Sequence, residues 1–316
     1  MKWTLAAYLL YFLLQDPNLE QNDDLLTVTH EGKSISSVSR DAHSLPVFPL
    51  LDMEKVSRWM NELDRKTYTE AVNARIGGSG QIVPGQNGHK LDRKAFLKRY
   101  YGYLYGSGPA SIEVPTYPVY PKVDTELLAS LRAQQIGYYI TYFNANNTDR
   151  SHNIALAAKA IDGTVVFPGE TFSFNRVVGI RTTGKGYRRA TVIVRGELSE
   201  GIGGGICQVS STLFNAADRA GLNIVQRYSH SRHVPYVPPG RDATVSWGGP
   251  DFAFKNAYNQ PVLIRSFASG GSVAVSIFSS DVIEYVPRKV PSMSNRLPEE
   301  INDTPTHPIP ANGKKR

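Results

Sequence analysis

The single cysteine of the 316-residue chain, Cys207, stands where a glycine-rich turn predicts the start of a helix. Gly203, Gly204 and Gly205 form the turn, and apolar residues at helical spacing follow the cysteine until Gly221, which is expected to end the helix. Free backbone N–H groups and the positive end of the helix dipole favour a thiolate in the first helical turn. A thiol placed there could be a nucleophile, a metal ligand or a small buried apolar residue.

His230 and Asp242 follow the cysteine in the chain and supply the other two residue types that a cysteine nucleophile needs. An imidazole within hydrogen-bond reach holds the thiolate, and a carboxylate fixes the tautomer of the imidazole. The sequence therefore predicts that Cys207 attacks a carbonyl carbon and that Asp242 orients the base. The base that protonates the leaving amine would be His230 or His233.

The same residues allow other roles, which the sequence leaves open. In the catalytic reading, the backbone N–H of Cys207 and the side chain of Gln208 are candidates for stabilising an oxyanion. In a metal site, His230 and His233, three residues apart, would join Cys207 and Asp242 as a tetrahedral set. In a purely structural reading, the cysteine is buried, because free cysteine is among the most buried residue types.

Candidate binding residues lie near this cluster. The glycines 203–205 would let a ligand approach the backbone closely, Tyr236 and Trp247 could stack on sugar rings, and Arg241 is a further candidate. The basic loop 181–189 could contact carboxylates or phosphates. The alternative for the aromatic residues is a half-buried position in strands.

The first residues of the chain are typical of an export signal. A lysine at position 2 precedes an apolar run over residues 3–14, which is shorter than the roughly 20 residues of a spanning helix. Residues 1–15 are therefore predicted to be a signal peptide or membrane anchor, the alternative being a buried helix. The protein would then act on the outer face of the cytoplasmic membrane or in the cell wall. One cysteine excludes an intramolecular disulfide, so the core must hold the fold.

The composition is that of a globular protein with a basic balance. Hydrophobic residues make up 41% of the chain, charged residues 20%, and the net charge is +7. Such a charge suits an anionic partner, which could be nucleic acid, a membrane face or an acidic wall polymer. No basic helix or nucleic-acid motif is visible, so a wall polymer is preferred and nucleic acid is not expected. No cofactor is predicted.

The pattern of elements predicts an α+β protein with two domains. Residues 16–44 are read as a linker or a short hairpin, and residues 45–122 as a small α+β module with helices beginning at Asp52 and Asp92. Residues 136–280 form a mixed α+β domain with antiparallel hairpins and the cysteine-bearing helix. Residues 286–316 are a proline-rich basic tail that is expected to be disordered.

Several ordered segments resemble the VanW family, which was first noticed in vancomycin-resistance gene clusters. The segments are 141–144 (TYFN), 152–154 (HNI), 168–175 (PGETFSFN), 203–210 (GGGICQVS) and 236–245 (YVPPGRDATV). The resemblance implies a surface protein of Gram-positive bacteria that is linked to the cell wall and contributes to its maintenance or to glycopeptide resistance. It implies no activity.

Two weaker resemblances concern the flanking module and the cysteine helix. Residues 45–122 resemble the peptidoglycan-binding module that often precedes a VanW domain, through 84–88 (PGQNG) and 90–92 (KLD). Peptidoglycan is the partner that this resemblance implies. The order of a helix-borne cysteine, a histidine and an aspartate is similar to the transglutaminase and papain-like arrangement, which would make the protein an amidase, peptidase or transpeptidase.

Overall fold

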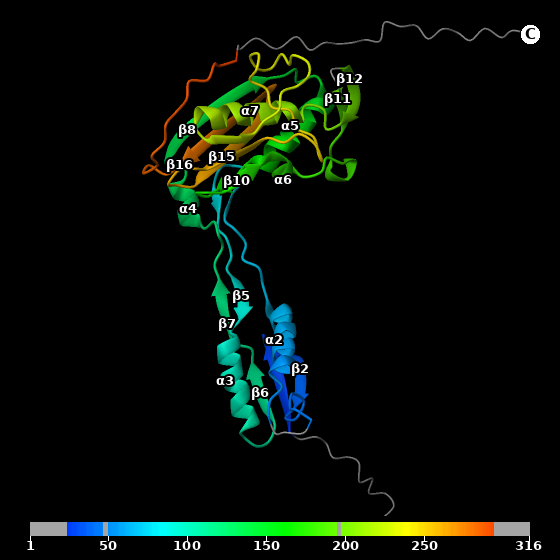
Figure 1. The fold of residues 1–316 in the computed structure, drawn as a ribbon, viewed down its shortest axis with the longest axis vertical. Coiled ribbons are helices and arrows are strands. Elements are labelled where there is room, and N and C mark those ends of the chain that lie inside the picture. The colour runs from blue at the N-terminus through cyan, green and yellow to red at the C-terminus, as the bar shows by residue number, and fades with distance from the viewer. Residues whose placement is uncertain (1–23, 47–49, 195–196, 294–316) are drawn as a thin grey trace, which may run out of the picture. The chain divides into compact units, whose positions relative to one another are not determined.

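The computed structural model of the chain describes residues 24–46, 50–194 and 197–293 (Figure 1). The chain divides into two compact units, of which the first comprises residues 1–74 and 84–124 and the second residues 75–83 and 125–316. Both units mix helices with antiparallel strands, which confirms the predicted α+β class. The predicted signal or anchor, 1–15, lies outside the described residues. Among the described residues, none of the helices has the length and apolar content to cross a membrane.

Unit 1 is built on a three-stranded sheet in the order β2-β1-β6, with β1 antiparallel to β2 and parallel to β6. A second antiparallel pair joins β5 and β7. The elements of this unit are β1 (Leu25–His30), β2 (Lys33–Ser39), α2 (Met53–Thr67), β5 (Gly88–Leu91), α3 (Arg93–Leu104), β6 (Ala110–Glu113) and β7 (Thr116–Val119).

Local sequence explains where the helices of unit 1 begin and which face they bury. The carboxylate of Asp52 accepts hydrogen bonds from two N–H groups in the first turn of α2, and that of Asp92 accepts one, from the N–H of Ala95 in α3. The apolar face of α2 is buried in a core with Leu26 and Val28 of β1. Residues 16–44 were predicted as a linker or a hairpin, and the hairpin is what their described part forms. A linker is excluded there because β1 supplies core residues.

Unit 2 is built on a four-stranded antiparallel sheet in the order β8-β16-β15-β9. A three-stranded sheet, β10-β14-β13, and the hairpins β11-β12 and β3-β4 complete its strands. The elements are β3 (Arg75–Ile76), β4 (Ile82–Val83), α4 (Thr125–Ser130), β8 (Gln134–Tyr142), α5 (Thr148–Ile161), β9 (Val165–Val166), β10 (Thr171–Ser173), α6 (Phe174–Val178), η1 (Thr183–Lys185), β11 (Arg189–Val194), β12 (Glu197–Ile202), α7 (Ile206–Arg219), β13 (Asn223–Gln226), β14 (Ala253–Lys255), β15 (Val262–Ser269) and β16 (Ser272–Ser279).

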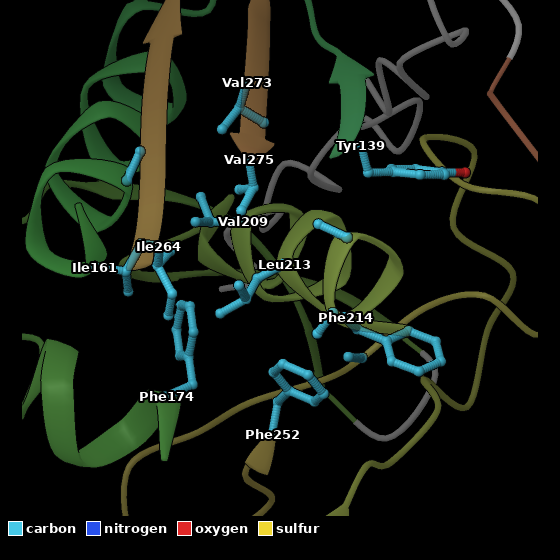
Figure 2. Close-up of a cluster of buried hydrophobic side chains, with 14 of the residues drawn as sticks. Tyr139, Ile161, Phe174, Val209, Leu213, Phe214, Phe252, Ile264, Val273 and Val275 are labelled. Atoms are coloured by element: carbon cyan, nitrogen blue, oxygen red, sulfur yellow. The ribbon is translucent and has the colours of Figure 1, made fainter. Parts of the chain in front are cut away.

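The cysteine-bearing helix α7 is the central element of the unit 2 core. It packs on β8 and β16 and, together with α5, covers one face of the large sheet (Figure 1). Figure 2 shows α7 with Val209 and Leu213 between Val273 and Val275 of β16 on one side and Phe252 on the other. Because nearly every side chain of α7 is buried, its position is fixed from all sides.

Two segments in the later part of the chain differ from what their sequence indicates. Residues 243–247 alternate as a strand would, but they are irregular, and their backbone instead meets α7 through hydrogen bonds such as that from Ser210 Oγ to Ala243 O, 2.5 Å. Residues 286–293 were expected to be disordered, but Val290 is buried and Pro291 O accepts a hydrogen bond from Tyr139. Residues 294–316 lie outside the described residues.

Candidate active site

The glycine turn before Cys207 is set by backbone geometry and close packing. Gly203 and Gly205 have φ values of +87° and +101°, a conformation that is unfavourable for residues with a Cβ atom. At Gly204, a Cβ atom would lie 2.5 Å from Thr191 O of β11. The turn therefore requires all three glycines, and it places Cys207 in the first turn of α7.

Cys207, His230 and Asp242 come together although they lie up to 35 positions apart in the sequence. Nδ1 of the His230 ring lies 2.7 Å from Asp242 Oδ2, and the backbone N–H of His230 donates to the same oxygen at 2.6 Å. The ring also interacts with the Cys207 thiol through hydrogen bonding and charge. The other contacts of the sulfur are Val245 O at 3.5 Å and Thr244 Oγ1 at 3.8 Å. Since Nδ1 is engaged by Asp242, Nε2 is the ring nitrogen left for the sulfur. Both His230 and Asp242 stand on loops rather than on strands.

The environment of the three residues favours a thiolate–imidazolium pair. Burial raises the pKa of the Cys207 thiol, but the hydrogen bond and charge of His230 outweigh burial and bring it below its usual 9.0. Burial lowers the pKa of His230, but its bonds to Asp242 and Cys207 raise it to about 9. For Asp242, the bonds from His230 overcome desolvation and lower the pKa to about 2. At neutral pH the carboxylate is ionised and the imidazole holds its proton.

Arg227, which was not predicted as a site residue, also contacts Asp242. It follows β13 directly; its Nε donates to Asp242 O at 2.6 Å and its Nη2 lies 3.3 Å from Asp242 Oδ1. The side chain of Asp242 is only 9% exposed, so this second cation helps to keep a buried carboxylate ionised. Only its place at the end of a strand, shortly before His230, distinguished Arg227 in the sequence.

The side chain of Gln208 is not available to an oxyanion, which corrects that part of the prediction. It is fully buried, and its amide donates both hydrogens, to Thr141 Oγ1 and to Tyr142 O, each at 3.0 Å. Its Oε1 accepts from Arg150 at 2.7 Å. The side chain thus ties α7 to β8. The backbone N–H of Cys207 has no acceptor among the described residues, so it stays a candidate donor.

Arg241 also differs from its predicted binding role. Its Nε donates to Asn215 Oδ1 and its Nη2 pairs with Asp218 Oδ2, both at 2.7 Å, while the guanidinium lies 4.5 Å from the centre of the Phe214 ring. These contacts hold the loop before Asp242 on α7. The residue is structural because its donors are directed to the helix rather than to an open site.

The metal alternative finds no support. His233 is exposed and makes no hydrogen bond within the described part of the chain, whereas His230 is turned toward Asp242 and Cys207. Among the described residues there is no group of three or more His, Cys, Asp or Glu side chains suited to a metal ion. His230, and not His233, is therefore the imidazole that accompanies the thiol.

A cavity of about 860 Å³ opens at the cysteine. Cys207 and His230 line it, as do the glycine turn, the buried Tyr236 and the half-exposed Trp247. The hairpin β11-β12 contributes an apolar wall, and the cavity also holds three basic side chains, which are Arg150, Arg181 and Arg232. This size is large enough for a ligand of the dimensions of a short peptide or a few sugar rings.

Two families match the chain, one in each half. Residues 149–278 match the family described as "VanW like protein", and residues 21–107 match the family described as "Putative peptidoglycan binding domain". The second match begins well before residue 45, the predicted start of the module, and includes the hairpin β1-β2. Together the two matches describe a cell-wall-related protein.

Two relatives carry the similarity further. The chain is 59% identical over 293 residues to "Uncharacterized protein YoaR" of Bacillus subtilis (strain 168), covering 92% of this chain and 96% of that protein. It is 37% identical over 111 residues to "Vancomycin B-type resistance protein VanW" of Enterococcus faecalis (strain ATCC 700802 / V583), covering 33% of this chain and 40% of that protein. No solved structure matches the chain.

Proposed function

The chain belongs to the VanW family, and from that premise we propose that it is a cell-wall protein whose Cys207 thiolate cleaves or transfers an amide bond of wall peptides. One observation carries the proposal: the His230 ring is hydrogen-bonded to Asp242 and interacts with the Cys207 thiol, and the thiol and the ring line a large cavity. Nucleophile, base and orienting carboxylate are the groups that thiol acyl transfer requires.

The proposed reaction has two steps, acylation and deacylation of Cys207, and His230 transfers a proton in each. Cys207 Sγ forms a bond to the carbonyl carbon, the C–N bond breaks, and the His230 imidazolium gives its proton to the leaving amine. The backbone N–H of Cys207 supports the oxyanion. Water, or an amine of a second peptide, then attacks the thioester and returns a proton to His230, which restores the thiolate. The two acceptors correspond to hydrolysis and transpeptidation.

Unit 1 would hold the protein on its substrate. Its match to a peptidoglycan-binding family supports peptidoglycan as the polymer that it binds. The charge pattern of residues 1–15 supports export to the outer face of the cytoplasmic membrane, where that polymer lies. The similarity to a vancomycin resistance protein supports a contribution to glycopeptide resistance, which altered wall peptides would provide.

Replacing the nucleophile separates catalysis from binding. Cys207→Ser should lower the turnover of soluble wall peptides by at least about 1,000-fold, because the residues of a catalytic triad act as a unit. Binding of the full-length chain to sedimented sacculi should be unchanged, since Cys207 lies outside the matched peptidoglycan-binding region. Turnover is measured by chromatography of the released peptides.

A matched pair of histidine variants tests which imidazole acts. His230→Gln should lose turnover to a similar extent, whereas His233→Gln should keep it, because it removes an exposed ring that makes no hydrogen bond to any described residue. If wild-type protein bound sacculi but released nothing from any wall peptide, a binding protein without catalysis would replace the proposal. Equal turnover in wild type and Cys207→Ser would exclude the thiol as the nucleophile.

A further inference from the structure

Arg181 carries a buried guanidinium that the fold leaves unsatisfied. Both of its terminal nitrogens, Nη1 and Nη2, are buried, and neither has a hydrogen-bond partner among the described residues. Burying a cation without a partner is costly, because hydration is lost and nothing replaces it. Arg227 and Arg241 differ, since they direct their donors to named acceptors, and Arg150 of the same cavity donates from Nη2 to Gln208 Oε1. The unpaired guanidinium of Arg181 therefore favours binding of an anionic group from outside the chain.

The side chain lies beside the nucleophile. Arg181 lines the same cavity as Cys207, and its Cβ and Cγ would be 3.5 Å from a Cβ at Gly203, so it rests on the turn that begins α7. Its guanidinium lies 5.8 Å from the centre of the Phe174 ring, which supports it from one side. Burial lowers the pKa of Arg181, and the charge of the Cys207 thiolate counteracts that effect.

No carboxylate among the described residues forms an ion pair with this cation. Asp251, whose charge favours the charged form of Arg181, accepts hydrogen bonds from Ser173 Oγ and from the backbone N–H groups of Asn175 and Phe252. The other arginines of the predicted basic loop are already paired on the surface, Arg188 with Asp149 at 3.0 Å and Arg189 with Glu200 at 3.7 Å. Within that loop, Arg181 is the arginine that reaches the cavity wall.

We propose that Arg181 binds the terminal carboxylate of the peptide whose last amide bond Cys207 attacks. This inference rests on the proposed function. A guanidinium fork matches a carboxylate with two parallel hydrogen bonds, which would satisfy the two unpaired nitrogens at once. The apolar wall made by Ile193, Leu198 and Ile202 suits the side chains of a short peptide and excludes water from the ion pair.

The geometry then defines the product. With the carboxylate on Arg181, the thiolate bonds to the carbonyl carbon of the preceding residue, and the C–N bond to the last residue breaks. The imidazolium of His230 protonates the departing amine, so a single amino acid leaves and the remaining peptide stays as a thioester. Water or a second amine completes the cycle as before. Arg181 would thus be a specificity-determining residue for action at a free peptide end.

Two small alkylating reagents test the anchor without a known substrate. Iodoacetate carries a carboxylate and iodoacetamide is its neutral amide, and Cys207 is the only thiol of the chain. With free cysteine as the reference, the ratio of iodoacetate to iodoacetamide rate constants should be raised about tenfold in the wild-type protein, since a hydrogen-bonded charge pair supplies that much discrimination. Arg181→Gln should abolish this preference while iodoacetamide still labels the thiol.

Arg188→Gln is the matched control, because it removes an equal charge from an exposed pair and should keep the preference. Loss of the preference for iodoacetate in both variants would mean that the overall positive charge of the cavity causes it. Survival of the preference in Arg181→Gln would also contradict carboxylate binding by Arg181. If neither reagent labelled wild-type Cys207, the proposed function would fall together with this inference. Labelling without preference would remove the anchor alone. Arg181→Lys, which keeps the charge without the fork, provides a second variant if Arg181→Gln does not fold.

Wall peptides distinguish the source of the carboxylate. Turnover should fall at least about tenfold when the terminal carboxylate of a stem peptide is converted to an amide, and Arg181→Gln should no longer distinguish the two peptides. Conversion of a side-chain carboxylate alone should have little effect. The opposite pattern would contradict the assignment to a peptide end.

Discussion

The charge of a single sulfur atom decides what the site can do. Burial alone would raise the pKa of Cys207 and leave a neutral thiol at physiological pH. The imidazolium of His230 reverses that effect, and it stays protonated because Asp242 and the thiolate raise its pKa to about 9. The reactive form of the cysteine therefore depends on its partner more than on the helix that carries it.

The pH dependence of alkylation measures this balance. The thiolate is the reactive form, so the rate with iodoacetamide rises with pH and reaches half its maximum at the pKa of the thiol. We expect a midpoint below 9.0 in the wild type. In His230→Gln the lowering interactions are lost while burial remains, so the midpoint should move upward. His233→Gln should leave it unchanged, and a wild-type midpoint at or above 9.0 would contradict the thiolate–imidazolium pair.

At the scale of elements, the site depends on how closely α7 approaches the large sheet. Gly137 of β8 makes this approach possible, because a Cβ atom there would lie 2.4 Å from Ala216 O and 2.9 Å from Ala220 Cβ. Gln208 then joins the same helix to β8 through two hydrogen bonds. The first turn of α7, with its thiol, is held by contacts at the far end of the helix as well as by its own glycines.

Substitution of Gly137 should show that the close approach of α7 to β8 contributes to stability. Gly137→Ala is expected to lower the free energy of unfolding by about 1–3 kcal/mol, the usual cost of overpacking, since both contacts would be shorter than van der Waals distance. Gly184→Ala is the matched control, because its nearest neighbour atom would be 3.9 Å away and its φ is not positive. Denaturant unfolding compares the two. Equal stability would mean that α7 moves away from β8 without cost.

Elements with a clear periodicity were predictable from the sequence, and irregular segments were not. The helix of Cys207 and the hairpin of β15 and β16 follow from apolar spacing and glycine turns. The loop of residues 243–247 has the alternation of a strand, but hydrogen bonds with Ser210 and Ser211 of α7 override that preference. The packed segment 286–293 could not be predicted because its few apolar residues fill gaps left by distant elements.

Some residues of the predicted site could likewise be inferred from the sequence, whereas the roles of others depend on tertiary structure. Residue types and their order predicted that Cys207, His230 and Asp242 lie together, because thiol chemistry restricts which residue types can serve, and the structure brings the three side chains together. The roles of Gln208 and Arg241 were mistaken because only tertiary structure determines whether a donor is already engaged. Nothing in the sequence distinguished Arg181 from the other arginines of its loop, since its missing partner is a property of the folded unit.

At the scale of the whole molecule, each unit has a hydrophobic core of its own. Phe96 and Tyr100 are fully buried in the core of unit 1, and Leu213 and Phe252 in that of unit 2. No residue belongs to both cores among the described ones. Separate cores are compatible with the proposed function, in which unit 1 binds the polymer and unit 2 carries the chemistry.

Unfolding should therefore occur in two transitions that respond to different substitutions. Phe96→Ala should destabilise unit 1 by about 3–5 kcal/mol and Leu213→Ala unit 2 by about 2–5 kcal/mol, through lost burial and the cavities left behind. Calorimetry should show each variant lowering one transition temperature, while Tyr105→Ala, at a side chain that is 87% exposed, lowers neither. With rising temperature, sacculus binding should be lost with the Phe96-sensitive transition, and selective labelling by iodoacetate with the Leu213-sensitive one. A single transition lowered by both variants would mean that the two cores unfold as one, and binding and chemistry would then not be separable in this chain.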